Sequence, residues 1–336
     1  MTNSHKALTV HKADATWCFQ FHSESAAMDP AEIRRREEFL KRQQDFKENA
    51  FKIIHTMLDW CNITPRSKHL VDEILHSIFF LGKINQVPFS PEEIIPDEQM
   101  LSGLREKYPR PFEFYLTQLP RRSPFSCVMD MIVMQKQPEN ENQIMQSLRD
   151  FITALKPDFL VSSTICVSQK SNNSVRHYGV SMSTSGRDAR SIVIGASCLS
   201  AWDEYVAGAV MTYYVKNPNK KYFDFTIKIP DDVRCEAFSL KDGGKMKPCR
   251  SCGNMFGLNT DVAREWPYGN CAEVESLSNL LKNEIEVKEQ SQPKSDTWTP
   301  QNIKRARENV LKKLKDILHN ISFNTWDGHF YVPQAE

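Results

Sequence analysis

Two neighbouring stretches decide how the chain is interpreted: MKPCRSCGNMFGL at residues 246–258 and WPYGNCAEVESLSNLLKNEI at residues 266–285. Cys249 and Cys252 are spaced i, i+3, so two thiolates on one turn can reach a single ion. Cys271 can supply a third thiolate, and Glu273 follows two residues later. Three ligands with a nearby carboxylate are the composition of a catalytic zinc site that keeps a fourth position for water.

Both stretches also have the features of helix starts. Pro248 suits the first position of a helix, and Asn270 is a candidate N-cap for a helix with apolar residues at helical spacing. The thiols would then lie at the positive ends of two helices, where thiolate is favoured over thiol. We therefore expect Zn²⁺ as the cofactor, bound by Cys249, Cys252 and Cys271.

These residues resemble the motifs of the zinc-dependent cytidine deaminase-like superfamily. Residues 248–252 (PCRSC) are similar to its Pro-Cys-x-x-Cys motif, and residues 271–273 (CAE) to its motif of a His or Cys followed two residues later by Glu. The resemblance implies that Glu273 is the catalytic acid and base, and that water activated by zinc attacks the base of a nucleoside, a nucleotide or a single-stranded nucleic acid. Asn254, Trp266, Tyr268 and Asn270 are candidates to contact that base because they lie close in sequence.

The order of the motifs departs from the superfamily, which places the x-Ala-Glu motif before the Cys pair. The helix expected from Ala201 offers only Cys198, Asp203 and Glu204 nearby, with no Cys-x-Glu or His-x-Glu. Either a permuted connection moved the motif to the following helix, or the Cys-Ala-Glu sequence is a coincidence. The resemblance covers about forty residues directly.

Two other interpretations use the same cysteines. In the first, the chain is a non-catalytic, zinc-stabilised binding or signalling protein, for example an effector of innate immunity. That site would need a fourth ligand, for which Cys235, His177 and His329 are candidates. In the second, no metal binds, and the cysteines are small buried apolar residues.

The rest of the chain predicts an α-helical N-terminal region followed by an α/β domain with a three-layer, deaminase-like mixed sheet and flanking helices. The expected divisions are an irregular segment at 1–28, a helical region at 29–118, the α/β domain at 119–286, a polar linker at 287–300, and an amphipathic basic helix with a tail at 301–336. A change in periodicity near Pro120 sets the main boundary.

Within these divisions, apolar runs and helical periods predict individual elements. Helices are expected at 68–81, 141–155, 201–215 and 302–321, and strands at 125–134, 159–167, 178–184, 191–198, 222–229 and 233–240. An Asp-Gly turn between aromatic residues at 326–331 predicts a short hairpin.

Composition limits the partners and the compartment. The 336 residues carry a net charge of +1, so any attraction for nucleic acid must be local, and the basic face of the helix at 302–321 is the clearest candidate. Nine scattered cysteines and no apolar leader favour a cytoplasmic location, with the nucleus as a second compartment. No apolar run is long enough to span a membrane.

Overall fold

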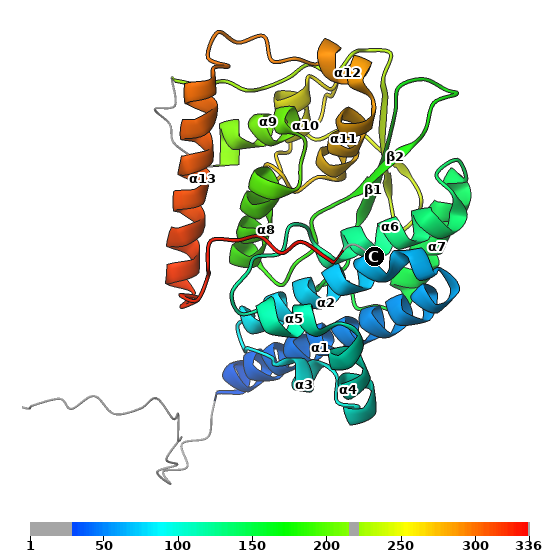
Figure 1. Cartoon of the computed structure of the whole chain (residues 1–336), viewed down its shortest axis with the longest axis vertical. Helices are drawn as coiled ribbons and strands as arrows, with labels where there is room; N and C mark the ends of the chain where they lie inside the picture. The colour runs from blue at the N-terminus through cyan, green and yellow to red at the C-terminus, as the bar shows by residue number, and fades with distance from the viewer. Residues whose placement is uncertain (1–28, 215–221, 335–336) are drawn as a thin grey trace, which may run out of the picture. The chain divides into compact units, whose positions relative to one another are not determined.

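The structure of the chain is a computed structural model that describes residues 29–214 and 222–334 (Figure 1). The segment 1–28, predicted to be irregular, lies outside the described residues. Two compact units divide the chain, Met1–Leu40 and Lys41–Glu336. In the first unit, residues 30–40 form the charged, mostly exposed start of helix α1 (Pro30–Ile63). Everything described below belongs to the second unit.

Helices fill the part of this unit that precedes the sheet. After α1 come η1 (Pro65–Ser67), α2 (Lys68–Lys83), α3 (Pro91–Ile94), α4 (Glu98–Lys107), α5 (Pro109–Phe114), α6 (Pro124–Lys136) and α7 (Glu141–Thr153). The helices predicted at 68–81 and 141–155 are confirmed by α2 and α7. Pro91, Pro109 and Pro124 are each the first residue of a helix, a position where the missing N–H costs nothing.

Two of the predicted strands are helices. Residues 125–134 form most of α6, and residues 191–198 lie within α8 (Arg187–Ser200). Both helices bury most of their circumference, and the buried residues of α8 run without a gap from Ile192 to Cys198. A helix that is apolar on most sides loses its 3.6-residue period and resembles a buried strand in sequence.

A small four-stranded sheet lies at the centre of the α/β part, in the order β2-β1-β3-β4. Its strands are β1 (Thr164–Gln169), β2 (His177–Val180), β3 (Arg234–Ser239) and β4 (Lys245–Met246). All three pairings of these described strands are antiparallel, in place of the predicted mixed sheet. Residues directly opposite each other therefore alternate between hydrogen-bonded and non-hydrogen-bonded pairs.

Helix α11 (Ala272–Asn283) lies directly on one face of this sheet, because the residues beneath it are small. Gly179, Cys166 and Ala237 are paired across β2, β1 and β3 and form one row. A Cβ added to Gly179 would lie 2.2 Å from the backbone nitrogen of Ser276 and 2.6 Å from the carbonyl oxygen of Ala272. Only glycine permits this approach, and it brings the start of α11 onto the sheet.

The opposite face of the sheet meets the segment around α7. The Tyr178 hydroxyl, on β2, donates a 2.7 Å hydrogen bond to the carbonyl oxygen of Pro138. Arg234, on β3, forms two 2.7 Å hydrogen bonds with the carboxylate of Glu141, the first residue of α7. Helices therefore cover both faces of the small sheet (Figure 1).

The remaining elements are α9 (Glu204–Tyr214), α10 (Arg250–Phe256), α12 (Ile285–Gln290) and α13 (Pro300–Asn320). The strand predicted at 222–229 is wrong: this segment has no strand, although Ile227 and Ile229 donate backbone hydrogen bonds to Met255 and Phe256. Part of the predicted linker at 287–300 is helical in α12. The C-terminal hairpin is also absent from the described residues; instead, Phe330 bridges to Leu119.

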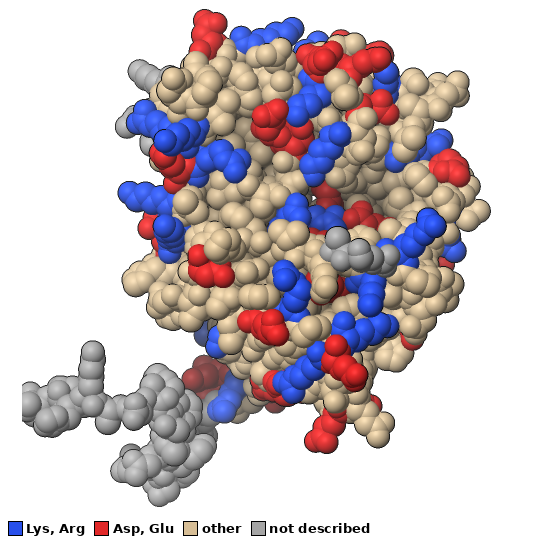
Figure 2. Space-filling view, in the orientation of Figure 1, with Lys and Arg blue, Asp and Glu red and all other residues tan. Residues whose placement is uncertain are grey.

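Helix α13 has the predicted amphipathic form. Its buried side packs on α8 and α9, and its exposed side carries six basic residues, Lys304, Arg305, Arg307, Lys312, Lys313 and Lys315. Basic side chains gather over this helix in Figure 2. Within the described residues, none of the helices has both the length and the apolar character needed to cross a membrane. Phosphate binding by α13 stays a prediction.

Candidate metal centre

The three predicted ligands converge in space. Cys249 Sγ lies 3.4 Å from Cys271 Sγ and 3.7 Å from Cys252 Sγ, and the three sulfurs all lie within 4.8 Å of one another. Tetrahedral zinc with Zn–S bonds of about 2.3 Å sets its sulfurs about 3.8 Å apart. The cluster therefore has a spacing that fits one metal ion, and thiolates are donors that zinc prefers.

Two helix starts hold these sulfurs. Cys249 is the N-cap of α10, with Cys252 in its first turn, and Cys271 is the N-cap of α11. The N-cap predicted at Asn270 was one residue too early, and the first helical position predicted at Pro248 was two residues too early. Cys249 and Cys271 themselves have the extended backbone of N-cap residues. Helix α10 thus positions two of the thiols, and helix α11 positions the third.

A hydroxyl from inside the Cys-x-x-Cys turn joins the two halves. Ser251 Oγ donates a 2.6 Å hydrogen bond to the carbonyl oxygen of Trp266 and accepts a 3.0 Å bond from the Trp266 backbone N–H. The Arg250 backbone N–H also donates to the carbonyl oxygen of Arg264. These bonds lock the segment leading to Cys271 against the turn that carries the other two thiols.

The thiols share charge unequally. Contacts with Cys252 and Cys271 hold the pKa of Cys249 well below its usual range, and backbone N–H groups of the first turn of α10 act in the same direction. Contacts with Cys249 and Cys271, followed by burial, raise the pKa of Cys252. One thiolate flanked by two thiols is therefore the favoured state without an ion. A metal would replace the two remaining protons.

Glu273 lies beside the cluster. Its side chain is buried, and burial raises its pKa to about 7. The charge of Cys249 also raises this pKa, while a contact with the Cys252 side chain lowers it. A carboxyl group with a pKa near neutrality can both accept and donate a proton under ordinary conditions.

Glu273, Cys249 and Cys271 line one cavity of about 160 Å³. Of the four residues predicted to contact a base, Trp266 and Asn270 line the same cavity. The Trp266 side chain is 41% exposed and stacks under the Arg264 guanidinium, 3.8 Å from the ring centroid. The cavity thus joins a buried acid and two thiols to an aromatic side chain at the surface.

The other two predicted contacts face elsewhere. Asn254 donates a 2.9 Å hydrogen bond to the Tyr268 hydroxyl, and the Tyr268 ring stacks on Tyr213 with centroids 4.0 Å apart. Neither Asn254 nor Tyr268 is among the residues that line the cavity. Proximity in sequence was therefore a poor guide for these two side chains.

Among the described residues, the group of candidate ligands around the cluster contains only the three cysteines. The proposed fourth ligands lie in other contacts: Cys235 Sγ is 3.7 Å from Cys166 Sγ, His177 Nε2 is 4.0 Å from Glu284, and His329 Nδ1 is 3.2 Å from Asp327. The described residues therefore offer three cysteine ligands, two of which line a cavity.

Sequence reasoning missed much of the cavity wall. The remaining lining residues come from the sheet and from the segments before it and after it: Ser163, Thr164, Ser181, Ala237, Met246, Lys247 and Ala272. For Ser163, Thr164, Ser181 and Ala237, the only signal was their place in or beside the strands predicted at 159–167, 178–184 and 233–240. Met246, Lys247 and Ala272 lie within the two cysteine-containing stretches but were not singled out. The Met182 backbone N–H ties this wall to the carbonyl oxygen of Asn270 with a 2.8 Å hydrogen bond.

Comparison with protein-family models, with curated proteins and with solved structures gave no significant match in any of the three. The chain is thus a mixed α/β protein with a cysteine cluster that could hold a metal ion, and the identity of that metal rests on the donor chemistry alone.

Proposed function

We propose that the chain is a zinc-dependent deaminase that acts on the base of a nucleoside, a nucleotide or a single-stranded nucleic acid. One observation carries the proposal: Glu273, with a pKa of about 7, opens onto the same 160 Å³ cavity as two of the three clustered thiols. A structural zinc site has no use for such a carboxyl group, whereas hydrolysis needs one.

Zinc, when bound, supplies a Lewis acid that makes water nucleophilic near neutral pH. Glu273 accepts a proton from the attacking water and returns it to the departing amine, so one water is consumed and one ammonia is released for each base. Trp266 offers an aromatic face on which a base can stack at the cavity mouth. Asn270 offers a carboxamide that can hydrogen-bond to the edge of the base.

The test measures ammonia release by the zinc-loaded full chain. The panel contains cytidine, adenosine, their monophosphates and single-stranded oligonucleotides. We expect Glu273→Gln, which keeps the shape of the side chain, to lower the rate by about 10²- to 10⁴-fold while zinc content is unchanged. No release by the wild-type protein from any substrate would overturn the proposal and favour the non-catalytic, zinc-stabilised interpretation.

Glu275→Gln is the matched control. Glu275 is also a buried carboxyl on α11, and burial raises its pKa to about 6. It accepts a 2.9 Å hydrogen bond from the Val180 backbone N–H and does not line the 160 Å³ cavity. We expect this variant to keep its activity. Zinc loss in Glu273→Gln would instead identify Glu273 as a ligand.

A further inference from the structure

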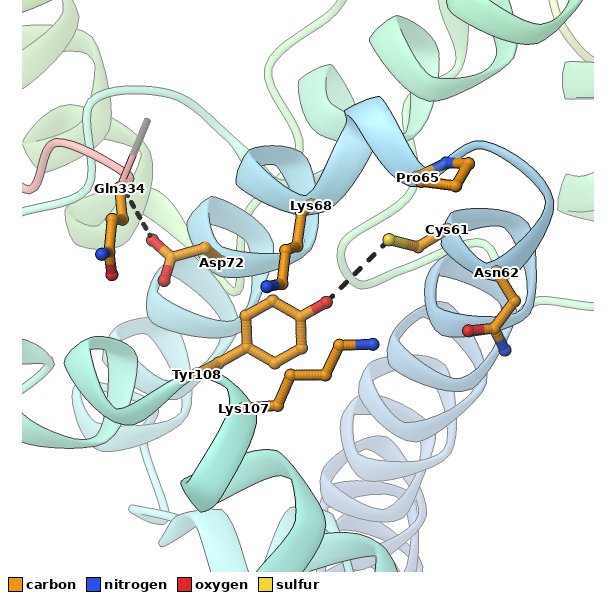
Figure 3. A pocket seen from close by; sticks show the side chains of 8 residues that line it. All are labelled: Cys61, Asn62, Pro65, Lys68, Asp72, Lys107, Tyr108 and Gln334. Atoms are coloured by element: carbon orange, nitrogen blue, oxygen red, sulfur yellow. Dashed lines mark hydrogen bonds between the residues drawn. The ribbon is translucent and has the colours of Figure 1, made fainter. Parts of the chain in front are cut away.

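A second cavity, of about 710 Å³, opens among the helices that precede the sheet (Figure 3). The ends of α1 and α4, η1, the start of α2 and the C-terminal tail form its wall. The lining residues are Cys61, Asn62, Pro65, Lys68, Asp72, Lys107, Tyr108 and Gln334. It has no lining residue in common with the 160 Å³ cavity of the metal centre. Its volume is in the range of small-molecule sites, which is about 300–1,000 Å³.

Two ammonium groups dominate the chemistry of this cavity. Lys68 is the first residue of α2 and Lys107 the last residue of α4, and in Figure 3 both side chains lie beside the ring of Tyr108. Within residues 29–214 and 222–334, no ion pair involves either lysine. The first turn of α2 contains no acid. The last turn of α4 carries Arg105, Glu106 and Lys107, and of these only Lys107 lines the cavity.

Asp72 is the one acid in the described wall, and its carboxylate accepts hydrogen bonds from the C-terminal tail. Its Oδ1 accepts a 2.5 Å hydrogen bond from the Tyr331 hydroxyl and a 3.3 Å bond from the Gln334 backbone N–H. The side chain is buried, with 4% of the residue exposed. The carboxylate therefore holds the tail in place. Two lysines against this single acid leave the described wall with a net positive charge.

We propose that this cavity binds the phosphate monoester of a small molecule that carries hydroxyl groups. A phosphate group carries up to two negative charges near neutral pH, so it matches two ammonium groups that approach from different helices. Lysine binds phosphate as a point charge, whereas planar carboxylates are matched best by the fork of arginine, which this wall lacks. The carboxamides of Asn62 and Gln334 supply donors and acceptors for hydroxyl groups.

The test uses isothermal titration calorimetry of the full chain with glycerol 3-phosphate at low salt, and with glycerol as the ligand that lacks phosphate. We expect saturable binding of glycerol 3-phosphate with a Kd tighter than about 1 mM. The double variant Lys68→Gln/Lys107→Gln should weaken binding by at least about tenfold. Both lysines are exposed, so the variant should fold normally.

The matched control is Lys312→Gln/Lys313→Gln, which removes the same charge from the exposed side of α13. We expect its Kd to stay within about twofold of the wild-type value. Cys271→Ser should also keep binding, which separates this site from the metal centre. Three results would overturn the proposal: no saturable heat with the wild-type chain, equal binding of glycerol, or an equal loss in the α13 control.

Discussion

The two cavities of this chain are built in opposite ways. In the metal centre, Cys249, Cys252 and Glu273 are buried, and two hydrogen bonds between Ser251 Oγ and the backbone of Trp266 fix the segments around them. In the lysine cavity, Lys68 and Lys107 are exposed at the ends of two helices. Buried polar groups need their partners to be present in advance, whereas exposed charges are solvated until a ligand arrives. Ligand binding at the metal centre should therefore depend on the fold around it, and ligand binding in the lysine cavity should depend on the charge of the two lysines.

Removing one thiol gives the largest expected effect. Cys271→Ser leaves two sulfurs, 3.7 Å apart, on a single turn of α10. Two ligands do not hold zinc at micromolar concentrations, so we expect bound zinc to fall from about one per chain to less than about 0.1. Metal content after gel filtration, measured by atomic emission, checks this.

The matched control for the thiol is Cys235→Ser. Cys235 is partly exposed on β3 and lies outside the cluster of three sulfurs. We expect its zinc content to equal that of the wild type. Equal zinc loss in both variants would mean that the metal depends on cysteine content in general, and the assignment of the cluster would fail.

Gly179→Ala tests how far the metal centre depends on the fold. The added Cβ would meet the backbone of Ser276 at 2.2 Å, and backbone cannot rotate away as a side chain can. Helix α11, which carries Glu273 and is capped by Cys271, must then move off the sheet. Overpacking typically costs about 1–3 kcal/mol, and contact with backbone places this substitution at the upper end of that range. Chemical denaturation gives the loss of stability, and zinc titration should show weaker binding in the fraction that folds.

The metal centre and the lysine cavity also differ in how far their residues could be predicted from the sequence. The metal centre was predictable because its ligands lie within 23 residues and belong to a spacing that has chemical meaning. Helices with one polar side, such as α7 and α13, were predictable from their period. The row formed by Gly179, Cys166 and Ala237 was not, because pairing across three strands sets which small residues meet α11.

The lysine cavity could not be predicted either. Lys68 and Lys107 lie at opposite ends of a segment that contains three helices, α2 to α4, and several prolines, and Gln334 comes from the other end of the chain. Nothing in the pattern of an isolated lysine distinguishes a solvated side chain from one at a cavity mouth. The errors at α6 and α8 have a related cause, since burial on most sides removes the periodicity that identifies a helix.

The tail that closes the lysine cavity should be sensitive to acid. His76, on α2, is fully buried and stacks on the Tyr331 ring with centroids 3.8 Å apart. Burial lowers its pKa to about 3, against the opposing effect of Glu73 on the same helix and with a small contribution from Arg110 on α5. As pH falls below about 6.5, the His76 imidazole becomes protonated in the unfolded chain but stays neutral in the folded one. The free energy of unfolding therefore decreases from about pH 6.5 toward pH 3.

His76→Phe keeps an aromatic ring against Tyr331 but cannot titrate. Between pH 7 and pH 4.5 we expect the wild type to lose about 2–3 kcal/mol more stability than this variant. Urea denaturation at both pH values measures the difference. Equal losses in the two proteins would show that burial of neutral His76 does not contribute to the loss of stability in acid.

Gly103→Ala gives the smallest expected effect, and it isolates the helix that carries Lys107. Gly103 lies in the interior of α4 and is exposed, and a Cβ built on it has no neighbouring atom within 4 Å. Alanine should therefore stabilise the protein by about 0.5–1 kcal/mol, the helix-propensity difference alone. Thermal unfolding measures this gain, and the same substitution at Gly179 provides the opposite sign. If the lysine cavity depends on charge rather than on the stiffness of α4, the Kd for glycerol 3-phosphate should not change. A shift of tenfold in either direction would show instead that order at the end of α4 is part of the site.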